Sequence, residues 1–353
     1  MLLSKGHVPD SQSQLNRLLE RGLYVEIGLF EAHFSRMASA AKTIEQKKFD
    51  PFLIRRTMKL SLNRLLYSVI GGSAQSIQIL EFAEGLQDYA DTDADAVIAA
   101  SLLDREEECR AAAHSLSTAI LCSLLSKRLA WPEACQRSVV CAALTMNLGM
   151  LDLQQRLARQ ATPLAVAQLD LIHTHPEAAA TALLGIDVDD ATWLTAVRQH
   201  HERAGGKGYP QRLAAPVDES QLLRLVDVFF ARARARSDRP PLTPTQIVRE
   251  IFVEESQDAC AALVASLVKV VGIYPPGSFV KLASGEVAVI FRGGESPKTP
   301  LAASVTNASG EPNMQPVRRD TSREGYAIVS TVAPDKVNVG YDLGKLWITN
   351  AKS

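Results

Sequence analysis

Cysteine is scarce in this sequence, and its spacing excludes the common cysteine-based sites. Five cysteines occur among 353 residues, and no two of them are close enough for a zinc knuckle or a redox pair. Their number is odd, and four of them fall in a stretch with a helical, apolar pattern. We therefore expect free thiols in a reducing compartment. The five are Cys109, Cys122, Cys135, Cys141 and Cys260.

Long apolar runs and an excess of one charge are also missing. The apolar run from Ala259 to Val268 stops at Lys269, whereas a membrane span needs roughly 20 such residues. The start from Met1 to Ser4 is too short for a signal peptide, and Lys5 follows it. The formal net charge is −1, which indicates neither nucleic acid nor an anionic membrane as a partner. We expect a cytoplasmic protein with no membrane span and no nucleic-acid partner.

Residues 1–94 have a mixed pattern without a catalytic motif. Asp10 and Ser11 resemble N-caps of a short helix, and residues 23–27 favour a strand. Residues 58–69 are helical in pattern and end at Gly71-Gly72. This part is interpreted as a mixed α/β or linker module.

From residue 95 to residue 275 the pattern is strongly helical. Apolar residues recur at intervals of three and four, which predicts amphipathic helices. Pro132 suits the first turn of one helix, and Thr162-Pro163 and Thr243-Pro244 resemble a cap followed by the first helical residue of two others. Gly272 is expected to end the last helix, because Tyr274-Pro275-Pro276 blocks its continuation.

Residues 276–353 favour a small β-rich module. Residues 279–282 and 286–290 flank a Ser284-Gly285 turn, which is typical of a hairpin. Further strands are predicted over residues 327–332, 337–339 and 346–349. The predicted fold is therefore mainly α, a helical bundle with an N-terminal mixed segment and a small C-terminal β-rich module.

The seven histidines are unevenly distributed, and five of them lie between residues 114 and 201. They are His114, His173, His175, His200 and His201, and Asp227 follows on a later apolar helix. Imidazoles spread over several helices can converge on one metal in a bundle core. The same side chains also suit a polar helix end or buried hydrogen bonds, so both interpretations stay open at this point.

The residues after the histidine pair carry a family resemblance. His200-His201-Glu202 runs into Gly206-Lys207-Gly208-Tyr209-Pro210, which resembles the signature loop of the HD-GYP family of cyclic-di-GMP phosphodiesterases. His175-Pro176, Asp227, His114 and Arg239-Pro240 resemble further elements of that family. The resemblance covers about residues 100 to 275 and implies a helical HD-type domain. It also implies a metal site formed by His175, His200, His201, Asp227 and His114.

The sequence departs from this family at the residues that define it. Met146-Asn147 stands at the place of the His-Asp pair, Met150 at that of a lysine, and Gly205 at that of an aspartate. Arg110 stands where some members have a glutamate. By resemblance, the aspartate of the pair bridges two metals that activate a hydroxide. Asn147 is a weaker ligand for a dication, so the two-metal mechanism is not expected.

The resemblance therefore implies a catalytically impaired regulator of cyclic-di-GMP signalling, which binds a nucleotide or a partner protein. The alternative is an active metal-dependent phosphodiesterase with a reduced metal site. Either one divalent transition metal (iron, manganese or zinc) or none is expected. Cyclic-di-GMP and a diguanylate cyclase (GGDEF) domain are the partners implied, the latter through a docking loop of Gly206, Gly208, Tyr209 and Pro210.

Two arginine features have alternative interpretations. Arg110 lies one helical turn before His114, so its guanidinium could occupy a vacated cation site and pair with Asp227, or it could belong to a solvated charge run. A second group could meet nucleotide phosphates or could form a solvated helix end. That group is Arg232, Arg234, Arg236 and Arg239.

Overall fold

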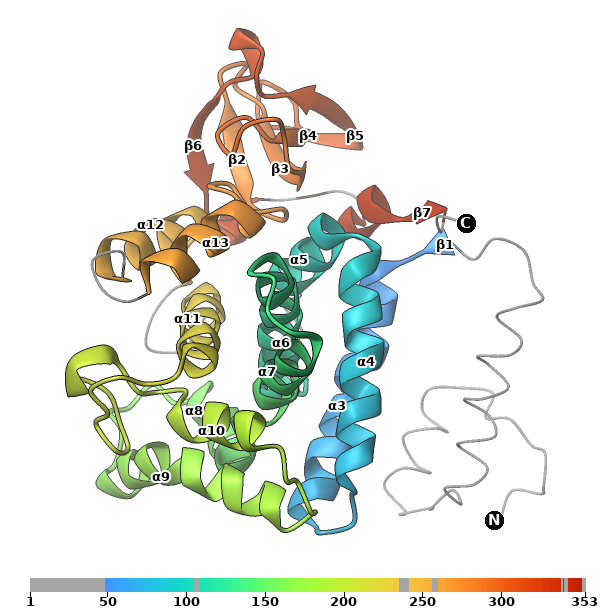
Figure 1. The fold of residues 1–353 in the computed structure, drawn as a ribbon. Helices are drawn as coiled ribbons and strands as arrows, with labels where there is room; N and C mark the ends of the chain where they lie inside the picture. Colours follow the sequence, from blue (N-terminus) through green and yellow to red (C-terminus); the bar gives the residue numbers. More distant parts are fainter. Residues whose placement is uncertain are drawn as a thin grey trace, which may run out of the picture. The chain divides into compact units, whose positions relative to one another are not determined.

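The computed structural model describes residues 48–104, 108–234, 241–255, 260–337, 339 and 342–350. Contacts along the chain separate two units, Asp50–Ile348 and a smaller one made of Met1–Phe49 with Thr349–Ser353. In the smaller unit, β1 (Lys48–Phe49) pairs antiparallel with β7 (Thr349–Asn350). The predicted fold class is confirmed, because the larger unit is mainly helical and carries a small antiparallel sheet (Figure 1). The helix and strand expected before residue 28 lie outside the described residues.

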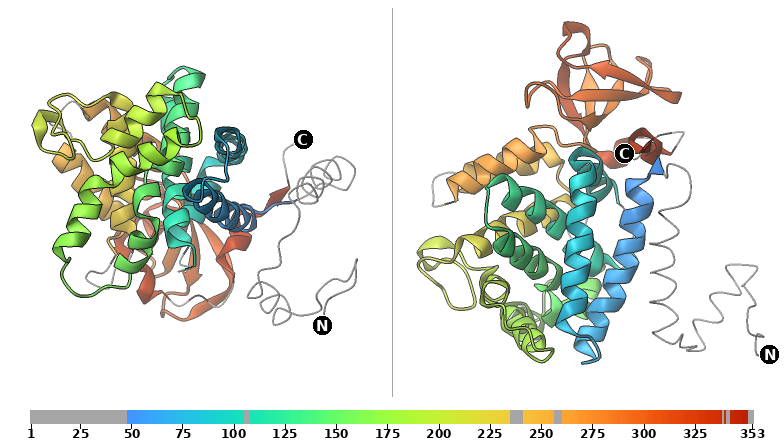
Figure 2. Two further views of the ribbon diagram at one scale, coloured as in Figure 1. Left: turned by 90° about the horizontal axis from the view of Figure 1, so that it is seen from below. Right: turned by 45° about the vertical axis from the view of Figure 1, so that its right-hand side comes forward.

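Three helices precede the part of the chain that carries the histidines. They are α3 (Pro51–Ile70), α4 (Ser76–Thr92) and α5 (Ala94–Leu103), and Figure 2 shows α3 and α4 side by side. Asp50 caps α3, since its Oδ1 accepts from the backbone N–H groups of Phe52 and Leu53 at 3.1 and 3.0 Å. Gly71 follows α3, as the sequence predicts. These helices belong to the unit Asp50–Ile348, and a domain boundary at residue 94 stays a prediction.

The core lies around α6 (Arg110–Arg128) and α7 (Glu133–Thr145), which pack against each other (Figure 1). Most side chains of α6 are buried, including Leu116 and Ile120, because α3 and α4 as well as α11 (Asp218–Ala233) contact this helix. Helix α10 (Ala191–Gln199) contacts α7. Burial on nearly every side identifies α6 as the central helix of the fold.

A 3₁₀ turn, η1 (Leu148–Met150), and helices α8 (Leu151–Leu157) and α9 (Val166–Leu184) follow α7. Gly149 lets η1 lie against α9, since a Cβ atom there would be 2.5 Å from the backbone oxygen of His175. The predicted start of α9 at Thr162-Pro163 is wrong. The helix begins at Val166, where Gln168 Oε1 accepts from the N–H of Ala165 and takes over the capping role.

Other predicted helix limits agree with the structure. Pro132 directly precedes α7, and α12 (Pro244–Glu255) begins at Pro244 with Thr243 Oγ1 accepting from Gln246 N–H at 3.3 Å. Gly272 ends α13 (Ala261–Val271) with a φ of 76°, a left-handed conformation that favours glycine.

The C-terminal sheet has the strand order β5-β4-β3-β2-β6, with all neighbours antiparallel. The predicted hairpin is confirmed as β2 (Phe279–Leu282) with β3 (Val287–Arg292), and the predicted strand after residue 326 is β6 (Ile328–Val332). Strands β4 (Leu301–Thr306) and β5 (Pro312–Asp320) were not predicted. The apolar core of the sheet consists of Val280, Leu282, Ala288, Ile290 and Ala302.

Two predicted C-terminal strands are wrong. Val337 and Val339 are not in a strand, and most of residues 346–349 belong to or follow the 3₁₀ segment η5 (Leu343–Trp347). Trp347 is buried and donates from Nε1 to the backbone oxygen of Phe291 at 2.8 Å. The prediction failed because a buried apolar residue in a 3₁₀ turn has the same sequence signal as a buried residue in a strand.

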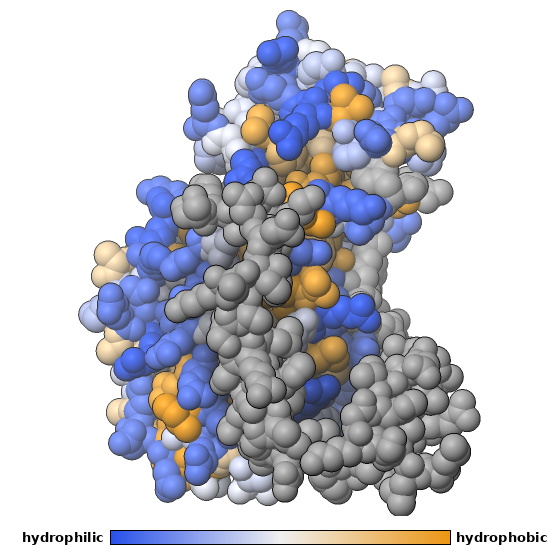
Figure 3. Space-filling model, turned by 90° about the vertical axis from the view of Figure 1, so that its right-hand side faces the viewer, coloured by the Kyte–Doolittle hydropathy of each residue, from blue (hydrophilic) through white to orange (hydrophobic). Residues whose placement is uncertain are grey.

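The described part of the chain contains no helix that is both long and apolar enough to cross a membrane. Figure 3 shows one face of the molecule, on which hydrophilic residues predominate and apolar residues form separate patches.

Candidate metal centre and cavity

Three histidines from two elements meet in the helical part of the structure. His175 lies on α9, His200 directly follows α10, and His201 comes next. The Nε2 atoms of His175 and His200 are 3.1 Å apart, and one ligand nitrogen from each of the three residues lies within 4.8 Å of the others. Within the part of the chain that the structure describes, this histidine triad is the only such group of three or more potential ligands.

Backbone carbonyls fix the orientation of two of these rings. Nδ1 of His175 lies 2.7 Å from the oxygen of Ile172, and Nδ1 of His200 lies 2.6 Å from the oxygen of Val197. A carbonyl only accepts, so each Nδ1 must carry the proton, and each neutral ring then presents a lone pair at Nε2. Two facing lone pairs at this distance repel each other unless a cation lies between them. Metal-bound histidines commonly donate the N–H of the other ring nitrogen to a backbone carbonyl in the same way.

The environment of the triad favours neutral imidazole. Burial lowers the pKa of His175 to about 3, and the neighbouring His200 acts in the same direction. Burial also lowers the pKa of His200 and of His201. Neutral imidazole is the form that binds metal, and three imidazoles suit zinc or another borderline transition metal. The donor set therefore fits one of the two expected alternatives, a single divalent transition metal.

Glu202 builds the loop that follows the triad. Its carboxylate is 1% exposed and accepts three backbone N–H groups, from Gln211 at 2.6 Å and from Arg212 and Leu213 at 3.0 Å each. Gly208 lies within this loop, and a Cβ atom there would be 2.3 Å from the nitrogen of Arg203. The acid and the glycine of the motif thus have structural roles that sequence reasoning missed, although their position in the motif was a signal.

The proposed docking loop has a buried and an exposed side. The ring of Tyr209 stacks on His201, with centroids 4.6 Å apart, and His173 meets it edge-on at 4.9 Å. Pro210 is exposed, and Gly206 is half-buried with a φ of 72°. Tyr209 thus contacts the triad directly, and Pro210 lies on the surface.

His114 and Asp227 form a separate pair, which we call the His–Asp pair of the cavity. Nε2 of His114 on α6 lies 2.6 Å from Oδ1 of Asp227 on α11. Burial alone would raise the pKa of Asp227, but the hydrogen bond to His114 and the nearby histidines outweigh burial and hold this pKa below its ordinary value. The carboxylate is therefore ionised and already has a partner.

One cavity of about 590 Å³ connects these groups. It is lined by His201 and Tyr209, by both members of the His–Asp pair, and by Arg110, Asn147, Met150 and Arg234 among others. Asn147 is 3% exposed and Met146 is fully buried in the core. Gly205 is exposed, with a φ of 74°. The volume is in the range of small-molecule sites.

The arginines predicted to be solvated have different environments. Arg110 is half-buried and lines the cavity, so it is not simply part of a solvated charge run. Arg232 pairs with Glu250 and Glu254 of α12 at 3.0 and 2.8 Å, whereas Arg234 lines the cavity. Arg236 and Arg239 lie outside the described residues.

Comparison with known proteins supports the same family relation. Residues 97–258 match the HD domain family model. The cyclic di-GMP phosphodiesterase PA4108 of Pseudomonas aeruginosa is 27% identical over 237 residues, which are 66% of this chain and 55% of that protein. The chain thus spans about half the length of this relative.

A solved structure has a similar fold. It is that of Bd1817, an HDG"Y"P protein from Bdellovibrio bacteriovorus, with a TM-score of 0.51 and 14% identity over 76% of this chain and 89% of that one. At this identity the likeness concerns the fold alone. The matched family model and the curated relative show that residues 97–258 form an HD domain related to the HD-GYP cyclic-di-GMP phosphodiesterases.

Proposed function

We propose that this protein binds cyclic-di-GMP in the cavity beside the histidine triad and acts as a regulator with weak or no phosphodiesterase activity. The observation that carries this proposal is Asn147 in the cavity wall, at the place where the resemblance implies a metal-bridging aspartate. A neutral amide cannot balance two dications as a carboxylate does. The relative from Pseudomonas aeruginosa, a cyclic di-GMP phosphodiesterase, supports the choice of ligand.

In this proposal the triad holds one divalent metal, and the rest of the cavity holds the nucleotide. A bound metal would supply Lewis-acid polarisation of a phosphate oxygen. Tyr209 holds His201 in place by stacking, and the His–Asp pair keeps His114 oriented toward Asp227. Without a second metal there is no bridging hydroxide, which removes the nucleophile of the two-metal mechanism.

The second candidate function is phosphodiester hydrolysis with a single metal. The His–Asp pair favours this candidate, because an imidazole held by a carboxylate at 2.6 Å in a cavity wall is the arrangement of a general base. In this case His114 would remove a proton from an attacking water. The two candidates share the ligand and differ in turnover.

We also propose that the loop with Gly206, Gly208 and Pro210 contacts a partner such as a diguanylate cyclase (GGDEF) domain. The exposure of Pro210 supports this proposal, and the rigid anchoring of the loop through Glu202 would keep its surface in one shape.

The decisive experiment introduces the His-Asp pair of the family motif at residues 146 and 147. We expect the purified protein to contain about one transition metal per chain and to hydrolyse cyclic-di-GMP negligibly with added manganese. The double substitution Met146→His with Asn147→Asp should add a second metal and raise turnover at least about tenfold. The same double variant with His200→Ala is the matched control and should stay inactive. Robust turnover by the unmodified protein that disappears in His200→Ala would establish the second candidate instead.

A further inference from the structure

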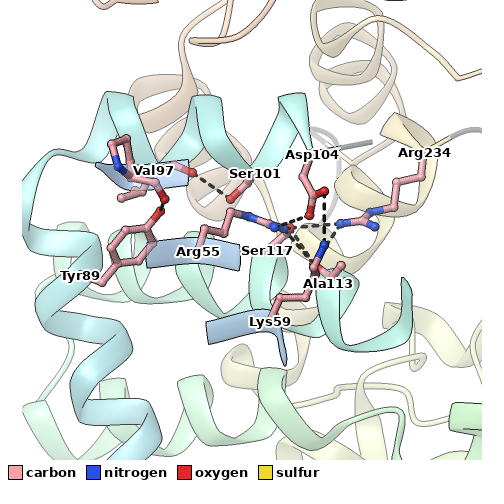
Figure 4. Close-up of polar contacts among 10 residues, drawn as sticks. Arg55, Lys59, Tyr89, Val97, Ser101, Asp104, Ala113, Ser117 and Arg234 are labelled. Atoms are coloured by element: carbon pink, nitrogen blue, oxygen red, sulfur yellow. Dashed lines mark hydrogen bonds and ion pairs between the residues drawn. The ribbon is translucent and has the colours of Figure 1, made fainter. Parts of the chain in front are cut away.

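Several cations gather next to the cavity, on the side of α3 and the end of α11. Figure 4 shows Arg55, Lys59 and Arg234 around a single labelled carboxylate, Asp104. Arg55 and Lys59 are 2% and 1% exposed. Arg55 forms an ion pair with Asp104, and Lys59 Nζ lies 3.7 Å from the other oxygen of that carboxylate. Asp104 therefore already neutralises charge on α3.

Arg234 is bound to this group only through neutral acceptors. One of its terminal nitrogens donates to the backbone oxygen of Ala113 at 2.9 Å and to Oγ of Ser117 at 3.3 Å (Figure 4). Arg55 donates to the same two acceptors, at 3.2 and 2.7 Å. Among the residues that the structure describes, no carboxylate lies within ion-pair distance of the Arg234 guanidinium.

The surroundings of Arg234 disfavour a positive charge. Burial lowers its pKa to about 9, and the charges of Arg55 and Arg110 act in the same direction, whereas Asp104 opposes them. A half-buried guanidinium beside like charges gains most from an anion that comes from outside the chain. A guanidinium also has five N–H donors in a planar fork, and only one of its nitrogens is used here.

Arg234 lies in the wall of the cavity beside the histidine triad. It directly follows α11, the helix that carries Asp227, and its backbone is extended, with φ of −98° and ψ of 135°. Arg234 and Arg110 both line the cavity that contains His201, and both also line a neighbouring cavity of about 280 Å³. The fixed hydrogen bonds to α6 hold the guanidinium at this wall.

We infer that Arg234 is a phosphate-binding residue of this cavity, which pairs with a phosphate group of the ligand through the part of its guanidinium not used by Ala113 and Ser117. This inference deepens the proposed function, on which it rests for the identity of the nucleotide. The chemistry that Arg234 recognises is a phosphate monoester or diester, since a planar guanidinium forms paired hydrogen bonds with phosphate oxygens. In such a site the triad contributes a bound metal cation, and Arg234 contributes a fixed positive charge of the chain.

The test compares Arg234→Gln with Arg232→Gln in the metal-bound protein of residues 1–353. Arg232 is the matched control, because it lies two residues away, at the end of α11, and binds Glu250 and Glu254 instead of lining the cavity. Calorimetric titration with cyclic-di-GMP should give a dissociation constant about ten- to a hundredfold higher for Arg234→Gln. For Arg232→Gln the constant should change less than about twofold. Arg234→Lys keeps the charge without the fork and should fall between the two.

A second measurement uses inorganic phosphate as the probe and does not depend on the nucleotide. Thermal unfolding is followed in phosphate and in chloride of equal ionic strength. Phosphate should stabilise the unmodified protein and Arg232→Gln, and this stabilisation should be lost in Arg234→Gln. The melting temperature in chloride alone reports whether the substitution merely weakens the fold.

The outcomes separate the inference from the proposed function. If cyclic-di-GMP does not bind the unmodified protein but phosphate stabilisation depends on Arg234, the proposed ligand is wrong and the phosphate-binding role of Arg234 stands. Equal nucleotide binding by Arg234→Gln and Arg232→Gln would overturn the inference and leave the proposed function intact. Absence of phosphate stabilisation in the unmodified protein would also overturn it.

Discussion

The histidine triad and the His–Asp pair occupy the same neighbourhood but have opposite electrostatic needs. In the triad, two Nε2 atoms face each other at 3.1 Å, with both Nδ1 atoms committed to carbonyls. In the pair, Nε2 of His114 meets a carboxylate oxygen at 2.6 Å. The two facing nitrogens of the triad therefore require a cation from outside the chain, whereas His114 and Asp227 already bind each other through a hydrogen bond.

This difference bears on the proposal that the site holds one metal and not two. Asp227 does not depend on a metal as its partner, because Nε2 of His114 lies 2.6 Å from its Oδ1. The triad has no carboxylate within its ligand group, so without an ion it keeps facing lone pairs in a buried place.

The largest expected effect comes from breaking the His–Asp pair. Asp227→Ala should lower the free energy of unfolding by up to about 3 kcal/mol, because it leaves Nε2 of the buried His114 without its charged hydrogen-bond partner. Urea denaturation with and without chelator measures this loss, which should be the same in both conditions. Asp91→Ala is the control, since Asp91 pairs with Lys127 at the same 2.6 Å but on the surface, and it should cost no more than about 1 kcal/mol. A loss after Asp227→Ala that appears only in the metal-bound protein would mean that Asp227 is a metal ligand.

Removal of a triad member should affect metal binding more than the fold. His200→Ala should weaken zinc binding by roughly a hundredfold, or about 2.7 kcal/mol, because one of three ligands is lost. Competition with a chromophoric chelator measures the affinity. His173→Ala is the control, because this exposed histidine contacts Tyr209 and is not part of the triad. Equal affinities in the two variants would argue against a metal at the triad.

The stability of the chelator-treated protein should depend on pH through the triad. The pKa of His175 is about 3 in the folded protein and about 6.5 in the unfolded chain, so the unfolded chain binds more protons between these values. Stability is therefore complete above about pH 6.5 and falls with acidification, by up to about 1.4 kcal/mol per pH unit for each such histidine. His175→Phe should show a shallower slope, and His173→Phe should show the original one. Identical slopes in all three proteins would contradict buried neutral imidazoles.

The smallest effect is expected at the contact between the docking loop and the triad. Tyr209→Leu should cost about 0.5–1.5 kcal/mol of stability, because it removes the stacking on His201. Tyr209→Phe keeps the ring and should be close to neutral. If both substitutions weaken metal binding equally, the hydroxyl rather than the ring supports the triad.

The sequence predicted those elements whose limits depend on local chemistry. Thr243-Pro244, Gly71 and Gly272 mark helix limits correctly, and Ser284-Gly285 marks the hairpin. Caps and turns satisfy backbone groups within a few residues, so their signals are visible in short segments. Strand β5 escaped because its burial alternates weakly and it contains two prolines, and the start of α9 was misplaced because Thr162-Pro163 also suits a loop.

At the candidate site, too, the sequence predicted local features but not contacts between distant parts of the chain. The sequence alone predicted the mainly helical fold, and by resemblance it also predicted the motif residues and the departures at Met146, Asn147 and Met150. Only the tertiary structure decided that His175, His200 and His201 share one position, that Asp227 belongs to His114, and that Arg234 faces the cavity while Arg232 is bound to α12. The physical reason is that charge compensation depends on distances between side chains of different helices. Those distances are set by the packing of α6, α9, α10 and α11, which no short segment of sequence contains.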